Sequence, residues 1–211
     1  DQKYVEKEAR PFMSNTEINN DEYLLEDIIK DRALFLNNYQ NKKYADTYID
    51  FVNKTIESEK KLNHGKDDLS KAVAKYLSKL MAYKDEYEVA RLYTNGEFKE
   101  KLNNAFEGKL KLKFHVAPPL FAPKDPNTGK LKKITIGSWI LPVFKGLSKL
   151  KFLRGTILDP VGKTKERKME RFLISQYKED INKILKEVNS KNLSLAVQIA
   201  SIPEMIRGYG H

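Results

Sequence analysis

The chain has 211 residues, of which 40% are hydrophobic and 32% charged, so it is long enough to bury one sizeable core. It contains no cysteine, which excludes disulfides, cysteine-ligated zinc or iron–sulfur sites and a cysteine nucleophile. Its 39 basic and 29 acidic residues give a net charge of +10, and no apolar run approaches the roughly 18 to 20 residues of a membrane span, which excludes a transmembrane role.

The N-terminal part of the chain is acidic and has little pattern. Residues 1–20 form a poorly defined segment, and residues 1–30 hold eight acidic against four basic side chains, a local net charge of −4. No signal-peptide pattern is present, and we expect a cytoplasmic location. A first helix is predicted from about residue 21, because apolar residues recur at helical spacing over 24–36 and Asn20 or Asp21 can cap its first amides.

Further helical stripes follow this first one. The second covers 44–56 and leads to Asn-His-Gly at 63–65, where we expect a left-handed stop. The third, over 69–81, is the strongest periodic run in the chain, because its apolar residues fall on one face. The same spacing continues with a pause at 95–96, so bent helical structure is predicted over 21–107.

The period then changes to that of a small β-hairpin. Apolar residues alternate with lysine and histidine over 110–116, which is the two-residue rhythm of a half-buried strand. Prolines and an Asn-Thr-Gly sequence over 118–129 favour turns. Apolar residues at alternate positions return over 131–137, so we predict a hairpin between these two strands with a long tip.

The rest of the chain is predicted to be helical. Residues 138–153 resume helical spacing, and a turn at 159–162 precedes a long helix from about 164 to 189. A shorter helix over 193–202 ends at a proline. The predicted fold class is α+β and predominantly helical, with long helices and one small antiparallel element in a single module over 21–211.

Gly162-Lys163-Thr164 matches the end of a phosphate-binding loop, in which backbone amides and a lysine hold nucleotide phosphates. The spacing is wrong, because the preceding glycine, Gly155, lies too far before Gly162. Pro160 also lacks an amide that such a loop would use. We therefore interpret these residues as the start of a helix that Thr164 caps.

Signals for metal binding and acid–base catalysis are weak. His64, His115 and His211 occur singly, without the acidic neighbours of a zinc-binding motif, so we expect no metal site.

Three neighbouring carboxylates, Asp85, Glu86 and Glu88, could serve acid–base chemistry in a hydrolase or isomerase. Lys84 precedes Glu88 by four residues and Arg91 follows it by three, so helical ion pairing is the preferred interpretation.

The middle of the chain is strongly basic. Residues 109–171 hold sixteen basic and four acidic side chains, a local net charge of +12. This excess is compatible with a solvated face or with a surface for nucleic acid, phosphate or an acidic protein. Four aromatic residues interleave with these lysines and could stack on bases. They are Phe114, Trp139, Phe144 and Phe152.

Core packing is nevertheless the preferred role for the first three of these aromatic residues. Phe114 lies in phase with the apolar face of the predicted strand, and Trp139 and Phe144 suit a buried helix entry. A basic stretch without a recognised binding module is also weak support for nucleic-acid binding, which we therefore do not expect.

Four sequence blocks carry a resemblance to a known family. They read LSKLMAYKDEYEVARLY at 77–93, FHVAPPLFA at 114–122, LKFLRGTILDPVGKTKERKMER at 150–171 and SIPEMIRGYGH at 201–211. In this order and spacing the chain, from about residue 23 onward, resembles the C-terminal region of the fused form of indolepyruvate ferredoxin oxidoreductase. That family belongs to the thiamin-diphosphate-dependent 2-oxoacid:acceptor oxidoreductases.

The resemblance implies a parent enzyme that decarboxylates arylpyruvates or related 2-oxoacids on thiamin diphosphate and magnesium. It also implies electron transfer through an iron–sulfur cluster to ferredoxin, with coenzyme A as the acyl acceptor. This chain has no Gly-Asp-Gly motif for the diphosphate and no cysteine for a cluster. We therefore expect no catalytic, cofactor-binding or metal-binding residue in it, and we expect the chain to be part of a longer multidomain polypeptide.

The expected function is that of a non-catalytic accessory or interface module of this oxidoreductase. Its partners would be the catalytic domains of the parent chain or a second subunit, with ferredoxin as a further candidate. The alternative is a stand-alone basic nucleic-acid-binding protein. The candidate docking surface, on or beside the start of the long helix, consists of Lys163, Lys165, Arg167, Lys168 and Arg171.

Overall fold

A computed structural model describes residues 24–108, 111–116, 123, 126, 132 and 134–206. The described residues fall into two compact units, and the chain passes from one unit to the other after residue 84 and again after residue 151. Residues 24–84 and 152–206 form the unit that we call the bundle unit. Described residues within 85–151 form the hairpin unit.

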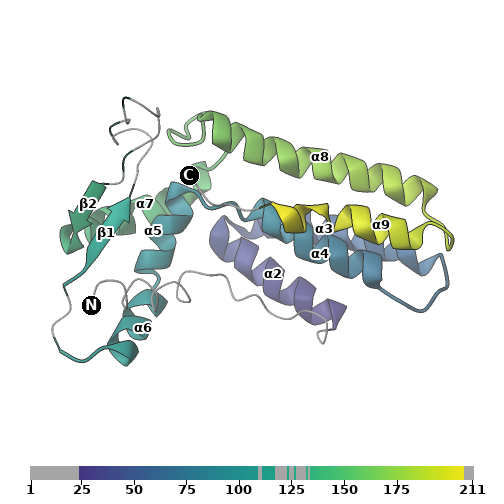
Figure 1. The fold of residues 1–211 in the computed structure, drawn as a ribbon, viewed down its shortest axis with the longest axis horizontal. Coiled ribbons are helices and arrows are strands. Elements are labelled where there is room, and N and C mark those ends of the chain that lie inside the picture. Colours follow the sequence, from purple (N-terminus) through teal and green to yellow (C-terminus); the bar gives the residue numbers. More distant parts are fainter. Residues whose placement is uncertain are drawn as a thin grey trace. The chain divides into compact units, whose positions relative to one another are not determined.

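The bundle unit consists of helices that pack around one central helix (Figure 1). The central helix, α4, is buried over ten of its fourteen residues and contacts α2, α3, α8 and α9. Its strong apolar stripe explains this position, because each buried face of α4 needs an apolar partner surface. The helices are α2 (Leu25–Tyr39), α3 (Lys42–Lys60), α4 (Asp68–Met81), α8 (Lys165–Glu187) and α9 (Leu193–Ala200), followed by the 3-10 turn η3 (Ile202–Met205).

A buried carboxylate from α3 caps the start of α4. The Oε1 of Glu59 accepts the amide of Leu69 at 2.9 Å, and its Oε2 accepts the amide and the hydroxyl of Ser70 at 2.8 and 2.5 Å. The Asp67 side chain, at the usual capping position, makes no such bond. Because the first amides of a helix lack intrahelical partners, Glu59 satisfies them and ties α3 to α4.

Buried tyrosine hydroxyls also join neighbouring helices of the bundle unit. Tyr48 on α3 donates to the carbonyl of Ala74 on α4 at 3.1 Å. Tyr177 on α8 donates to the carbonyl of Ala200 at the end of α9 at 2.8 Å. Burial raises the pKa of both hydroxyls well above the usual value for tyrosine, and in Tyr177 the neighbouring Tyr76 adds to the rise.

The described part of the hairpin unit contains three helices and a two-stranded sheet (Figure 1). These elements pack around aromatic residues. Phe114 and Phe144 are buried edge to face, with ring centroids 5.7 Å apart, and Tyr93 contacts both. The strands are antiparallel, with Phe114 opposite Ile136. The elements are α5 (Glu86–Thr94), α6 (Glu97–Ala105), β1 (Lys113–Val116), β2 (Ile134–Gly137), the 3-10 turn η1 (Ser138–Ile140) and α7 (Leu141–Lys149).

The predominantly helical α+β fold class and the antiparallel hairpin are confirmed. The left-handed stop after the second helix is also present, with φ of 51° at Asn63 and 71° at Gly65. The long helix α8 begins after Thr164 as predicted. The predicted cap at Asn20 or Asp21 and the tip of the hairpin lie outside the described residues, apart from isolated positions in the tip.

One detail of the prediction is wrong. Trp139 was expected in a buried helix entry, yet 69% of it is exposed, and Ile140 is buried instead. Residues 138–153 form two short 3-10 segments on either side of α7, of which the second, η2, covers Leu150–Leu153. The 3-10 geometry of η1 changes the angle between successive side chains, so helical spacing no longer predicts which one points inward.

Candidate functional site

The loop from 154 to 164, between η2 and α8, is held in shape by one buried carboxylate. The Oδ2 of Asp159 accepts the amide of Gly155 at 2.8 Å. Its Oδ1 accepts the amides of Val161 and Gly162 at 3.2 and 2.9 Å. A carboxylate with three backbone donors fixes a loop that has no regular secondary structure, because each buried amide needs an acceptor.

Gly162 is held at both its amide and its carbonyl. Its carbonyl accepts the Nη2 of Arg171 at 2.6 Å, and its amide donates to Asp159. The Thr164 hydroxyl accepts the amide of Arg167 at 3.3 Å, as a helix cap does. The interpretation of Gly162-Lys163-Thr164 as a capped helix start is therefore confirmed, and the Gly162 amide is already engaged within the loop.

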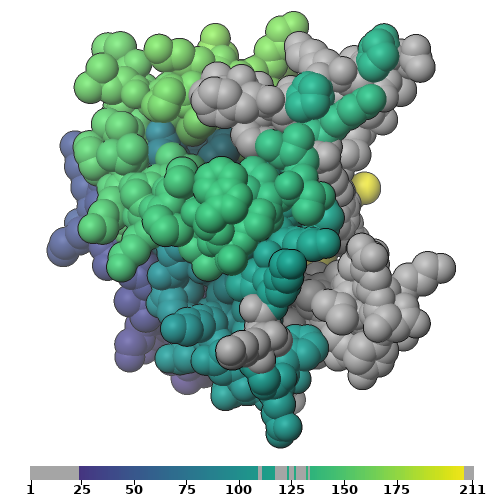
Figure 2. Space-filling model, turned by 90° about the vertical axis from the view of Figure 1, so that its left-hand side faces the viewer, coloured from purple at the N-terminus to yellow at the C-terminus, as the bar shows by residue number. Residues whose placement is uncertain are grey.

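Apolar side chains are exposed at the tip of this braced loop. Ile157 is 89% exposed and Leu158 is 75% exposed. Two apolar residues in the first turns of α8, Met169 and Phe172, are also exposed. In Figure 2, green atoms from the part of the chain around residue 150 lie at the surface that faces the viewer. Exposed apolar groups on an ordered loop are typical of a contact surface, since exposure to water is unfavourable for them.

The five predicted docking residues divide into two groups. Lys163, Lys165 and Lys168 are exposed. Arg167 forms an ion pair with Glu170 at 2.6 Å, and Arg171 turns inward to Gly162. The three lysines therefore supply the solvent-exposed positive charge of this region.

Exposed Met169 and Phe172 follow Lys165 and Lys168 at intervals of four residues, so these side chains are neighbours on α8. We call Lys163, Lys165, Lys168, Met169 and Phe172 the α8-start surface. It combines positive charge with apolar area.

A pocket of about 240 Å³ opens in the bundle unit, at the side of α8 that carries Arg171 and Lys178. Residues of α3, the end of α4 and the start of the 154–164 loop complete its wall. None of the described residues that line it is acidic. The lining residues are Gln40, Tyr44, Thr47, Met81, Tyr83, Arg154, Gly155, Arg171, Ile174 and Lys178.

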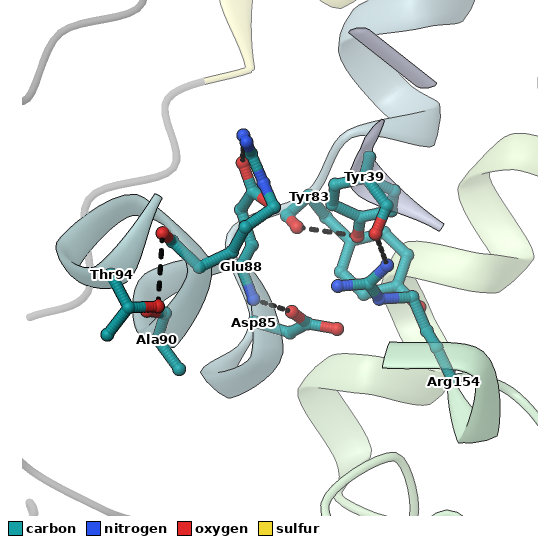
Figure 3. A network of polar contacts seen from close by, with 8 residues as sticks. Tyr39, Tyr83, Asp85, Glu88, Ala90, Thr94 and Arg154 are labelled. Carbon is teal, nitrogen blue, oxygen red and sulfur yellow. Dashed lines mark hydrogen bonds and ion pairs between the residues drawn. The ribbon is translucent and has the colours of Figure 1, made fainter. Parts of the chain in front are cut away.

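Arg154 is the most buried cation of this pocket, with 4% of its surface exposed. Its Nη1 donates to the Tyr39 carbonyl at 2.6 Å, and its guanidinium carbon lies 3.6 Å from the centre of the Tyr39 ring (Figure 3). The Tyr39 hydroxyl in turn donates to the carbonyl of Tyr83 at 2.8 Å. Stacking and hydrogen bonding therefore fix this guanidinium at the base of the 154–164 loop.

Two of the three carboxylates proposed for acid–base chemistry, Asp85 and Glu88, serve the structure of α5. Asp85 is buried and accepts the amide of Glu88 at 2.8 Å as the cap of this helix (Figure 3). Glu88 binds Arg91 through two contacts of 2.8 Å. The predicted pairing of Glu88 with Arg91 is confirmed, and both carboxylates have structural partners that account for them.

The two histidines that the structure describes, His64 and His115, each lie beside one polar side chain of their own unit. His64 Nε2 lies 3.6 Å from Glu59 Oε1, and His115 Nδ1 lies 3.1 Å from the Thr135 hydroxyl in the hairpin. His211 lies outside the described residues. Over the part of the chain that the structure describes, no three His, Cys, Asp or Glu residues group as metal ligands, and no helix is long and apolar enough to span a membrane.

Sequence reasoning missed the pocket. Its cations come from the start of the 154–164 loop and from two positions of α8 seven residues apart, and its apolar wall comes from α3, α4 and α8. Spacing along α8 indicates that Arg171, Ile174 and Lys178 share a face. No local pattern indicates that this face meets Tyr44 and Met81.

Comparison with known proteins gives a family but no function. A family of unknown function, DUF6537, matches residues 25–211. The chain belongs to this family. No curated protein and no solved structure matches the DUF6537 chain.

Proposed function

We propose that this DUF6537 chain is a cytoplasmic, non-catalytic interface module of a 2-oxoacid:ferredoxin oxidoreductase of the indolepyruvate type. The four sequence blocks that resemble the fused form of that enzyme support the choice of parent enzyme. Thiamin diphosphate, magnesium, an iron–sulfur cluster and coenzyme A would be bound by other domains of the parent. The proposed partners are those catalytic domains or a second subunit, and ferredoxin.

The α8-start surface is the observation that carries the proposed interface role. Lys163, Lys165 and Lys168 are exposed beside Met169 and Phe172, and the braced loop presents further apolar area nearby. Positive charge attracts an acidic electron carrier from a distance, and apolar side chains stabilise the contact once it has formed. The bracing by Asp159 reduces the conformational entropy that the loop would lose on docking.

The test is ferredoxin reduction by the intact enzyme that contains this chain, with an arylpyruvate and coenzyme A as substrates. The test variant replaces Lys163, Lys165 and Lys168 by glutamate. We expect KM for ferredoxin to rise about tenfold or more with a smaller change in kcat, because the lost attraction acts on encounter. The salt dependence of kcat/KM should also become weaker, since fewer charges remain to be screened.

The matched control replaces Lys61, Lys66 and Lys191 by glutamate. These lysines are exposed in the same unit but lie outside the α8-start surface, so the change in net charge is identical. An equal effect of both triple variants would contradict the docking surface. An intact polypeptide without 2-oxoacid:ferredoxin activity would contradict the choice of parent.

A further inference from the structure

We propose that the pocket lined by Arg154, Arg171 and Lys178 binds the phosphate group of a small phosphate ester. This inference is independent of the proposed interface role, because it concerns a different side of α8 and a different class of partner. It rests on the lining of the pocket and on the burial and hydrogen bonding of Arg171 and Lys178.

Arg171 supplies a donor that has no acceptor. Its Nη2 is bound to the Gly162 carbonyl, whereas its Nη1 is buried and has no hydrogen-bond partner among the described residues. A buried guanidinium N–H without an acceptor is unfavourable, because it has lost water and gained nothing in return. A small shift of the guanidinium group toward an oxyanion in the pocket would satisfy it.

Lys178 adds a second cation seven residues along the same face of α8. Its Nζ lies 5.6 Å from the centre of the Phe51 ring, and partial burial lowers the pKa of its ammonium group. No hydrogen bond or ion pair of Lys178 is present among the described residues. An anion in the pocket would counter the cost of this burial by direct attraction.

The lining as a whole favours a phosphate group on a small molecule. Arg171 and Lys178 both line the pocket, and a doubly charged phosphate attracts these two cations more strongly than a singly charged carboxylate does. The aromatic and aliphatic wall formed by Tyr44, Met81 and Ile174 suits an apolar part of the same molecule. A volume of about 240 Å³ lies below the roughly 300 to 1,000 Å³ of sites for drug-sized ligands, so the ester must be small.

Isothermal titration calorimetry of the 211-residue chain tests this site with three probes. Inorganic phosphate tests the anion alone, phenyl phosphate tests an ester with an apolar group, and benzoate tests the carboxylate alternative. We expect saturable binding of one phenyl phosphate per chain, tighter than inorganic phosphate and tighter than benzoate. The absence of saturable binding at low-millimolar phenyl phosphate, or tighter binding of benzoate, would overturn the proposal.

Lys178→Gln is the principal variant, because it removes a charge without breaking a hydrogen bond between described residues. We expect the Kd for phenyl phosphate to rise at least about tenfold, because a charged contact to the phosphate is lost. Arg171→Lys is the second variant; it keeps the charge and the stem but loses the planar fork, so binding should also weaken. Lys186→Gln is the matched control on the exposed part of α8, and a loss of affinity equal to that of Lys178→Gln would refute the site.

Discussion

At the scale of single residues, Asp159 determines the conformation of the loop that carries the exposed apolar tip. It is buried, and its carboxylate accepts three backbone amides of that loop. Gly162 is required at its position for a steric reason, because a Cβ there would lie 2.6 Å from the carboxylate carbon of Asp159 and overlap one of its oxygens. The placement of the exposed Ile157 and Leu158 thus depends on the backbone bonds of Asp159.

Gly162→Ala should therefore destabilise the chain. The new methyl group must displace the Asp159 carboxylate, and overpacking of this kind costs about 1–3 kcal/mol in the free energy of unfolding. Urea denaturation followed by circular dichroism measures the change.

Gly146→Ala provides a control of opposite sign. Gly146 lies within α7, and a Cβ there meets nothing within 4 Å. Alanine is a better helix former than glycine, so this variant should gain about 0.5–1 kcal/mol. A neutral or stabilising Gly162→Ala would show that the Asp159 carboxylate moves without cost, contrary to its role in the loop.

At the scale of elements, α8 uses its faces for different purposes. Tyr177 and Ile181 are buried against the bundle, and Arg171 and Lys178 face the pocket. Lys168 and its neighbours at the start of the helix are exposed. Burial of both Tyr177 and Ile181 follows from their i, i+4 spacing, which places them on one face.

The hydrogen bond from the Tyr177 hydroxyl of α8 to the Ala200 carbonyl of α9 should make the stability of the bundle unit depend on pH. The pKa of the Tyr177 hydroxyl is raised in the folded state, so the unfolded chain loses this proton first, from a pH of about 10 upward. The stabilisation is present below that pH and is lost as the pH rises above it. Tyr177→Phe should lower the free energy of unfolding by about 0.5–1.5 kcal/mol near neutral pH, through loss of the bond to Ala200.

Urea titrations at several pH values between neutral and alkaline measure this effect. The fall in stability above a pH of about 10 should be shallower in Tyr177→Phe than in the original chain. Phenylalanine has no hydroxyl, so the variant lacks the one group at this position whose pKa is raised by folding. Tyr48→Phe should reduce the slope in the same way, since burial raises the pKa of Tyr48 too. Slopes equal to that of the original chain would contradict the assigned role of these hydroxyls.

At the scale of the whole molecule, burial is unevenly distributed among the helices. Ten of the fourteen residues of α4 are buried, whereas none of the residues of α6 is. Amide hydrogen exchange should therefore be slowest in α4 and fast in α6, because exchange of α4 requires disruption of the bundle core. Mass-spectrometric exchange of the native chain measures both segments, and equal protection of α4 and α6 would contradict the assignment of α4 as the centre of the core.

The sequence predicted those elements whose signals are local. The apolar stripe of α4 and the cap of α8 at Thr164 needed only neighbouring residues, and both are confirmed. The predicted pause at 95–96 coincides with the break between α5 and α6. The helical spacing after residue 81 did not reveal the end of α4, because residues 82–85 interrupt the helix without disturbing the apolar period. Trp139 was misplaced for a similar reason, since the turn type at η1 is not encoded in spacing.

For this DUF6537 chain, composition and periodicity determined that it is mainly helical, basic and without cysteine, because these properties follow from residue type and local spacing. The tertiary structure decided which cations are exposed and which are turned inward. Lys163, Lys165 and Lys168 reach solvent, whereas Arg171 is bound to Gly162, although all four lie in the same short stretch. The pocket likewise depends on contacts between segments more than a hundred residues apart, such as Tyr44 and Lys178, and no local pattern encodes such contacts.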